Sequence, residues 1–144
     1  MSKKKVEVIQ PRSLAKGLLA GLIGGLVGVL AMAAAERLAP RHAKTSAGSP
    51  DPAPGSLSLE EMHWSFGAAV GAAYGAVAEY FPTATANQGA AFGMALETLA
   101  HEGTLPALGL LTGSAARDTA GGFTSHVVYG VTTEVVRGFV RKRL

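Results

Sequence analysis

GLLAGLIGGLVGVLAMAAA, residues 17–35, is the stretch that decides the fold of this chain. It contains no charged side chain and no strongly polar one. As an α-helix it would extend about 28 Å, close to the thickness of the hydrocarbon core of a bilayer. Lys16 and Glu36 flank it. The stretch therefore predicts a first membrane-spanning helix, around which the remaining chain is organised.

The composition favours a membrane protein. The chain has 144 residues, enough for one domain, and 16% of them are charged, compared with about 25% in soluble domains. The 19 glycines occur mainly inside apolar runs, as in transmembrane helices that approach one another closely. The chain has no cysteine, which excludes disulfides, thiolate metal sites and a cysteine nucleophile.

The N-terminal region also resembles a secretory signal, because Lys3, Lys4 and Lys5 precede an apolar run that ends in small residues. The apolar run is longer than the core of a usual signal peptide, and further apolar segments follow it. We therefore interpret this run as a helix that is retained in the protein.

Three further segments are apolar enough to form helices of the same kind. Glu97, His101 and Glu102 interrupt the segment that is the third span of the chain. The predicted fold class is an all-α membrane protein, a bundle of four transmembrane helices in one integral domain at 14–144. The predicted spans are at about 14–38, 62–81, 88–104 and 123–140, with a basic tail at 1–13, an exposed proline-rich loop at 40–57 and either an interfacial or a re-entrant segment at 104–112.

Basic residues gather before the first span and after the fourth, which predicts that both termini are cytoplasmic. An even number of spans agrees with this orientation, although Arg37, Arg41 and Lys44 would then lie on the outer side. Because the basic ends flank apolar spans, we expect the lipid bilayer as partner, with anionic headgroups at both termini, and no nucleic acid.

Small residues recur at intervals of four along each predicted span. Such rows allow two helices to approach closely, within one chain, in a homo-oligomer or with partner membrane helices. The predicted helix-packing residues are Gly17, Gly21, Gly24, Gly28, Gly67, Gly71, Gly75, Gly89, Gly93 and Gly130.

The same rows lead to ionisable side chains, which are costly in contact with lipid and are therefore expected to face one another inside the bundle. One interpretation is a proton-responsive cluster, since histidine titrates between about pH 5 and 8. The alternative is a network of hydrogen bonds that only fixes the packing. The cluster would be centred on Glu97, His101 and His126, with Glu79, Glu134, Glu36 and His63.

Enzymatic chemistry has little support in the sequence. Glu97 and His101 are four residues apart and share a helix face, as in some metal sites, but no zinc-binding His-Glu-x-x-His motif is present. Both aspartates lie in predicted loops, and no nucleophile elbow or phosphate-binding loop is found. We therefore expect no catalytic residues, no metal and no cofactor.

The chain contains a faint internal repeat. Residues 36–39 recur at 97–100, and residues 63–67 recur at 126–130. Two spans per unit would place both units in the same orientation. A tandem duplication of a helical hairpin and a chance match of composition both remain open.

The order of motifs resembles the YagU family of bacterial inner-membrane proteins. These motifs are HWSFG at 63–67, FGM with a glutamate and a histidine at 92–101, and SHVVYG followed by a glutamate and an arginine at 125–137. The family has no established biochemical activity, and the chain lacks a tryptophan near Leu96 that the family often has. The resemblance implies a bacterial inner-membrane location and a part in tolerating low pH.

Three functional hypotheses follow. The first is a small inner-membrane protein that contributes to acid tolerance through its intramembrane Glu and His side chains. The second is a non-catalytic scaffold or accessory subunit that packs through glycine-rich helix faces. The third is an oligomeric channel or transporter, since four helices leave little room for a pore.

Overall fold

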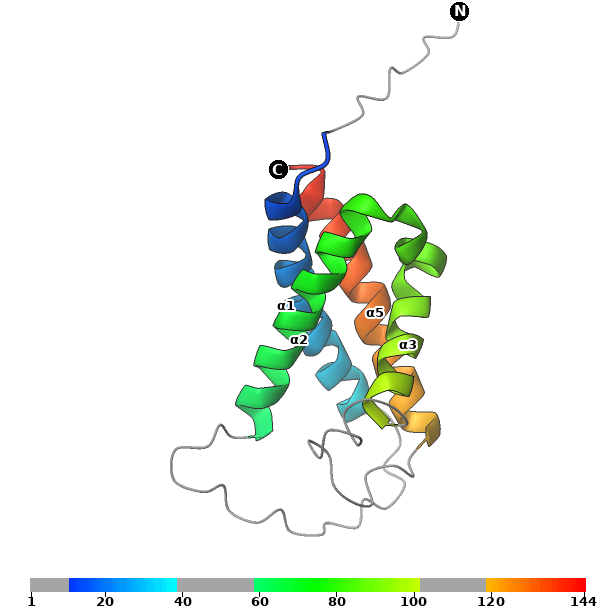
Figure 1. Cartoon of the computed structure of the whole chain (residues 1–144). Helices are drawn as coiled ribbons and strands as arrows, with labels where there is room; N and C mark the ends of the chain where they lie inside the picture. The colour runs from blue at the N-terminus through cyan, green and yellow to red at the C-terminus, as the bar shows by residue number, and fades with distance from the viewer. Residues whose placement is uncertain (1–10, 39–58, 102–118) are drawn as a thin grey trace, which may run out of the picture.

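The computed structural model describes residues 11–38, 59–101 and 119–144, and these residues contain helices and no strand. The predicted all-helical fold is therefore confirmed. The elements are α1 (Leu14–Leu38), α2 (Leu59–Tyr80), the 3₁₀ segment η1 (Pro82–Gly89), α3 (Ala90–His101) and α5 (Thr119–Arg141) (Figure 1). The predicted tail before residue 11, the proline-rich loop and the segment 104–112 lie outside the described residues.

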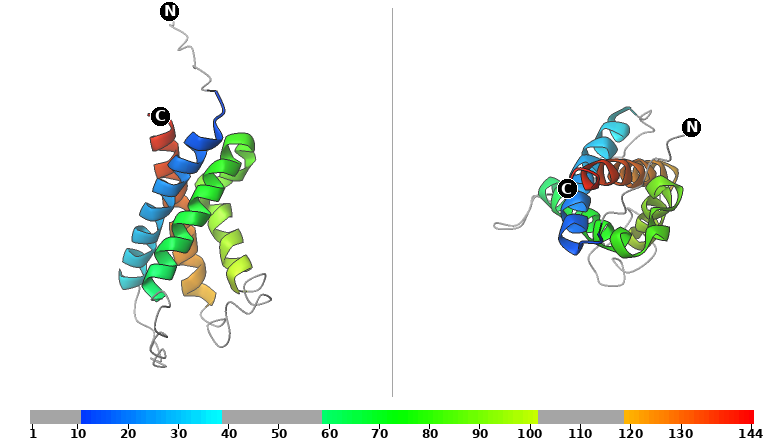
Figure 2. Two further views of the ribbon diagram at one scale, coloured as in Figure 1. Left: turned by 60° about the vertical axis from the view of Figure 1, so that its left-hand side comes forward. Right: turned by 90° about the horizontal axis from the view of Figure 1, so that it is seen from above.

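The four helices run alternately up and down, so that the start of α1 and the end of α5 lie at the same end of the bundle (Figure 1). α1 packs along α2 on one side and α5 on the other, and α3 packs against α5 (Figure 2). Within the described residues, α2 and α3 make little direct backbone contact. The bundle is therefore closed along three of its sides. Between α2 and α3, the ring of Tyr74 stacks on the ring of Phe92.

Glycines bring α1 and α2 into backbone contact. A Cβ added to Gly21 would lie 2.7 Å from Cα of Gly75, and one added to Gly71 would lie 2.6 Å from Cα of Gly25. Real Cβ atoms do not approach backbone this closely, so only glycine permits the observed distance between these two helices. Gly25 belongs to this contact but is not among the packing residues predicted from the sequence.

α1 carries a second glycine face, which is turned toward α5. A Cβ at Gly24 would meet the backbone of Thr133, and one at Gly28 would lie 2.8 Å from the ring of Tyr129. Gly24 and Gly25 differ by about 100° around the helix axis, so neighbouring glycines contact different helices. The glycine run at 24–25 thus allows α1 to lie between α2 and α5.

The turn before α3 differs from the prediction. The segment expected as a simple uncharged turn is the 3₁₀ element η1, and α3 is a helix of only 12 residues. Asn87, Gln88 and Gly89 all have positive φ, with 85° at Gly89. Gly89 also meets the backbone of Gly130, where a Cβ would not fit. The turn therefore reverses the chain close to α5, and the α-helical part of the third helix starts at Ala90, two residues later than predicted.

One helix, α1, is long and apolar enough to be a candidate membrane span among the described residues. A helix with these properties is also found in the core of soluble proteins and in signal sequences. This finding is weakly compatible with a membrane protein, and the predicted set of four spans stays a proposal.

Candidate functional site

A glutamate and a histidine from two different helices meet inside the lower half of the bundle, away from both termini. His126 Nδ1 of α5 lies 2.6 Å from Glu97 Oε2 of α3. The two side chains are 17% and 6% exposed. Gly93 of α3 packs on the backbone of His126, so the glycine contact holds the two helices close enough for this pair.

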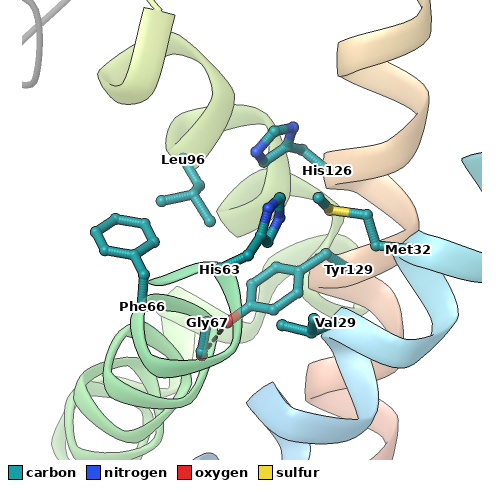
Figure 3. Close-up of a pocket in the computed structure, with 8 residues that line it drawn as sticks. All are labelled: Val29, Met32, His63, Phe66, Gly67, Leu96, His126 and Tyr129. Atoms are coloured by element: carbon teal, nitrogen blue, oxygen red, sulfur yellow. Dashed lines mark hydrogen bonds between the residues drawn. The ribbon is translucent and has the colours of Figure 1, made fainter. Parts of the chain in front are cut away.

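A small open pocket lies beside this pair, at the side of the bundle where α2 and α3 are not in direct contact. All four helices contribute to its wall, and His63 and His126 both line it (Figure 3). The remaining lining residues are Val29, Met32, Phe66, Gly67, Leu96 and Tyr129. The pocket is therefore mainly apolar, with two imidazole rings as its ionisable groups.

A second carboxylate lies nearer the end that carries the termini. Glu134 accepts hydrogen bonds from Arg137 Nε at 2.6 Å and Nη2 at 2.7 Å, one turn further along α5. Tyr74 of α2 donates its hydroxyl to the same carboxylate at 2.8 Å. Both members of the ion pair are less than 15% exposed. The charge of Glu134 is thus compensated inside the bundle.

A third carboxylate, Glu79, lies at the end of α2 and pairs with Arg141 at the end of α5. Arg141 donates from both Nε and Nη2 to the two carboxylate oxygens. Arg141 also donates to the backbone oxygen of Pro11 at 2.9 Å, and Glu79 accepts from the backbone N–H of Ser13 at 3.3 Å. This pair therefore joins α2, α5 and the segment that enters α1.

Aromatic rings separate the lower pair from the two upper ones. Tyr74 stacks on Phe92 with ring centroids 4.1 Å apart, and Phe92 lies 6.0 Å from Tyr129. Tyr129 is 2% exposed and donates its hydroxyl to the backbone oxygen of Gly67 at 2.6 Å. The interior thus consists of an apolar aromatic layer between two regions of paired charges.

One family model matches more than half of this chain. The model of a protein family of unknown function, DUF1440, matches residues 55–135. The chain belongs to the DUF1440 family. No curated protein and no solved structure matches the chain.

The DUF1440 match includes both residues of the Glu97–His126 pair, the glycines that hold α3 against α5, and all of η1. It does not include α1, nor Arg137 and Arg141. The lower pair and its pocket wall from α2, α3 and α5 therefore belong to the part of the chain that the family model describes.

The structure divides the seven residues of the predicted cluster. Glu97 and His126 meet, and His63 is an exposed residue at the same pocket. Glu36 is exposed at the end of α1 and takes no part. His101 ends α3, and its side chain lies outside the described residues. Glu79 and Glu134 form the separate pairs with arginine that are described above.

The ion pairs of Arg137 and Arg141 were not predicted, because basic residues at the end of the fourth span indicated only the orientation of the chain. The three-residue spacing of Glu134 and Arg137 on one helix could have indicated their contact. The pairing of Glu79 with Arg141 had no local signal, because the two residues lie on different helices. Trp64 packs against the buried cluster of Val29, Met32 and Tyr129.

Metal binding was a further alternative for the glutamate and histidine residues. Within residues 11–38, 59–101 and 119–144, no group of three or more acidic or histidine side chains could hold a metal ion.

Proposed function

We propose that the chain is an integral protein of the bacterial inner membrane whose Glu97–His126 pair responds to protons and contributes to acid tolerance. The observation that carries the proposal is the 2.6 Å contact between these two side chains, which come from different helices and lie almost buried beside an open pocket. The link to acid tolerance comes from the resemblance to the YagU family.

The distribution of side chains supports a membrane location. Large apolar side chains cover the outside of the bundle, while Glu97, Thr133 and Arg141 are buried. A soluble bundle has the opposite arrangement, because water favours polar residues outside. The exposed apolar residues include Leu14, Leu18, Leu19, Leu22, Val27 and Leu30 of α1, Phe66 and Val77 of α2, Met94 and Leu99 of α3, and Val135 and Phe139 of α5.

The polar side chains of α2 and α5 are compatible with four spans. The mean hydropathy of a helix includes every residue equally, whether its side chain faces lipid or the interior of the bundle. Polar side chains that face the interior therefore lower the mean hydropathy of α2 and α5. Glu79 and Glu134 face arginines inside the bundle, so the cost of placing them at membrane depth is reduced by pairing. α3 has 12 residues and would extend about 18 Å, so η1 would complete the distance across the bilayer.

The proposed orientation puts the Glu97–His126 pair in the outer half of the membrane, since both termini are at the opposite end. The groups that face this pair from the packed helices are His63 of α2, and the apolar side chains of α1 and α3. Acid outside the cell would reach His63 and His126 through the pocket. A proton taken up by the pair would change the charge of one of its two side chains, and with it the strength of their contact.

The test uses a deletion strain that expresses either Glu97→Gln or the control Glu36→Gln. The two glutamates occupy matching positions of the internal repeat, but Glu36 is exposed and Glu97 is buried. We expect loss of survival in acid for Glu97→Gln only, at equal abundance in the membrane fraction. Equal survival of both variants and the wild type would contradict the proposal.

A second candidate function is that of a scaffold or accessory subunit that binds other membrane helices. It is favoured by small exposed residues at intervals of four, namely Ser65, Ala69 and Ala73 on α2 and Ala91 and Ala95 on α3. Substitution of Ala69 and Ala73 by Ile would then abolish crosslinks to another helix in intact membranes. The crosslinks would form from a single cysteine placed at Ser65, in the same exposed row. If the chain with Ser65→Cys and no other substitution forms no crosslink, the result would argue against this function.

A further inference from the structure

We propose that the end of the bundle with both termini binds an anionic phospholipid, whose headgroup contacts Arg12, Lys142 and Arg143. The acyl chains of this lipid would lie along the exposed apolar face of α5. The inference relies on the proposed membrane location and is independent of the proposed role of Glu97 and His126.

Among the described residues, the positive charges at this end are only partly paired with carboxylates. Arg137 and Arg141 pair with Glu134 and Glu79, respectively, and the ammonium group of Lys16 donates to the backbone oxygen of Leu144. The side chains of Arg12, Lys142 and Arg143 are exposed. Within the described ranges, no carboxylate forms an ion pair with any of these three. Three positive charges are thus available to a ligand.

These three cations lie at one corner of the bundle. Arg141 donates a hydrogen bond to the backbone oxygen of Pro11, so residues 11 and 141 are in contact. Arg12 follows the first and Lys142 follows the second. A phosphate group at this corner would be within reach of side chains from both ends of the chain, and arginine offers several N–H donors in a geometry that matches phosphate oxygens.

Arg143 is held over an exposed aromatic ring. Its guanidinium carbon lies 3.3 Å from the centroid of the Phe139 ring, and its Nη1 donates to the backbone oxygen of Phe139. Phe139 is 57% exposed, and Val135, one turn earlier on α5, is 56% exposed. Exposed apolar side chains of α5 therefore lead directly to the cations. A phospholipid is complementary to this arrangement, because its anionic headgroup would contact the cations and its acyl chains would contact the apolar side chains.

The described residues at the opposite end of the bundle do not show this combination. Among them, the exposed charged side chains are Glu36, Arg37 and Glu61, two acidic and one basic. Charge complementarity thus selects the end with the termini for an anionic headgroup. Arg37 is also an exposed arginine at a helix end, so it provides a matched control for the removal of one positive charge.

The experiment measures thermal unfolding of the purified full chain in mixed micelles of a neutral detergent. The additions are phosphatidylglycerol, phosphatidylcholine or inorganic phosphate. We expect phosphatidylglycerol to raise the Tm of the wild type by about 5 °C relative to phosphatidylcholine, and inorganic phosphate to have no effect. The variant K142Q/R143Q should lose most of this shift, R12Q should lose part of it, and R37Q should keep it.

Equal shifts with the two lipids, or an unchanged shift in K142Q/R143Q, would overturn the proposal. A shift with inorganic phosphate alone would also overturn it, since the site would then bind a free anion. Fractionation of the cells that express the protein tests separately whether the chain is in the membrane. A chain that stays in the membrane but shows no lipid preference refutes only the lipid site, whereas a chain absent from the membrane refutes both.

Discussion

Arg141, the last residue of α5, forms a two-point ion pair with Glu79, the penultimate residue of α2, although 62 positions separate them in the sequence. The two side chains are 11% and 6% exposed. The same arginine also binds the backbone oxygen of Pro11. One guanidinium group therefore holds together the ends of three helices.

Removal of Arg141 should strongly destabilise the bundle. Arg141→Met leaves the Glu79 carboxylate without its partner in a site from which water is largely excluded, which typically costs about 3–5 kcal/mol. The free energy of unfolding in detergent micelles measures this effect, with the exposed neighbour Lys142→Met as control. The double variant Glu79→Met/Arg141→Met should recover most of the loss, because no unpaired charge remains. An equal loss in the single and double variants would contradict the ion-pair account.

A methyl group between α1 and α2 should not be tolerated. Gly71→Ala places a Cβ 2.6 Å from Cα of Gly25, and the two backbones have to move apart. We expect a loss of about 1–3 kcal/mol in unfolding free energy. Gly138→Ala is the control, since the nearest atom to a Cβ there is 4.0 Å away. Helix propensity favours alanine equally at both sites. A difference in stability between the two variants therefore measures the close approach of α1 and α2 at Gly71. Equal stabilities would contradict this role of Gly71.

The hydroxyl group of Tyr129 should contribute to stability through its hydrogen bond to Gly67. Tyr129→Phe removes the donor and leaves the carbonyl oxygen of Gly67 without it, at a cost of about 1–2 kcal/mol. Tyr80→Phe is the control, because Tyr80 is 41% exposed. The midpoint of denaturant unfolding in micelles distinguishes the two variants, and a Tyr129→Phe variant as stable as the wild type would rule out this contribution.

The helix α1 should remain part of the protein in the cell. It covers the glycine face of α2 and packs along α5, so its removal would expose both contact surfaces. We expect the intact mass of the purified protein to include α1, and a tag before residue 1 to be recovered in the same molecule as a tag after residue 144. Recovery of a shorter chain that begins near residue 35 would identify α1 as a cleaved signal.

The hydrophobic pattern was sufficient to predict the helices. Residues 14–38 form α1 with the predicted bounds, and the other predicted spans overlap α2, α3 and α5. An uninterrupted apolar run and the prolines that follow it act within one segment, so they can be interpreted without neighbours. The third helix was predicted less well, because the positive φ values at Asn87, Gln88 and Gly89 shorten it at its start.

The candidate site could be predicted only in part. The four-residue spacing in α3 and α5 indicated that Glu97 and His126 lie on the inward faces of their helices, since lipid would penalise them outside. The exposure of Glu36 was not visible in its sequence, because Glu36 follows the same kind of glycine row as Glu97. The difference arises from the partner helix: α5 approaches α3 at Gly93, whereas Glu36 lies at the exposed end of α1.

The sequence by itself determined the helical class, the helix boundaries within a few residues and the inward faces that carry glycine and charge. Only the tertiary structure decided which residues meet: Glu79 with Arg141, Glu134 with Arg137 and Tyr74, and Glu97 with His126. The periodicity of a helix fixes the direction of each side chain relative to its own axis. The depth and rotation of one helix against the next follow from backbone contacts at glycines, and these depend on the whole bundle.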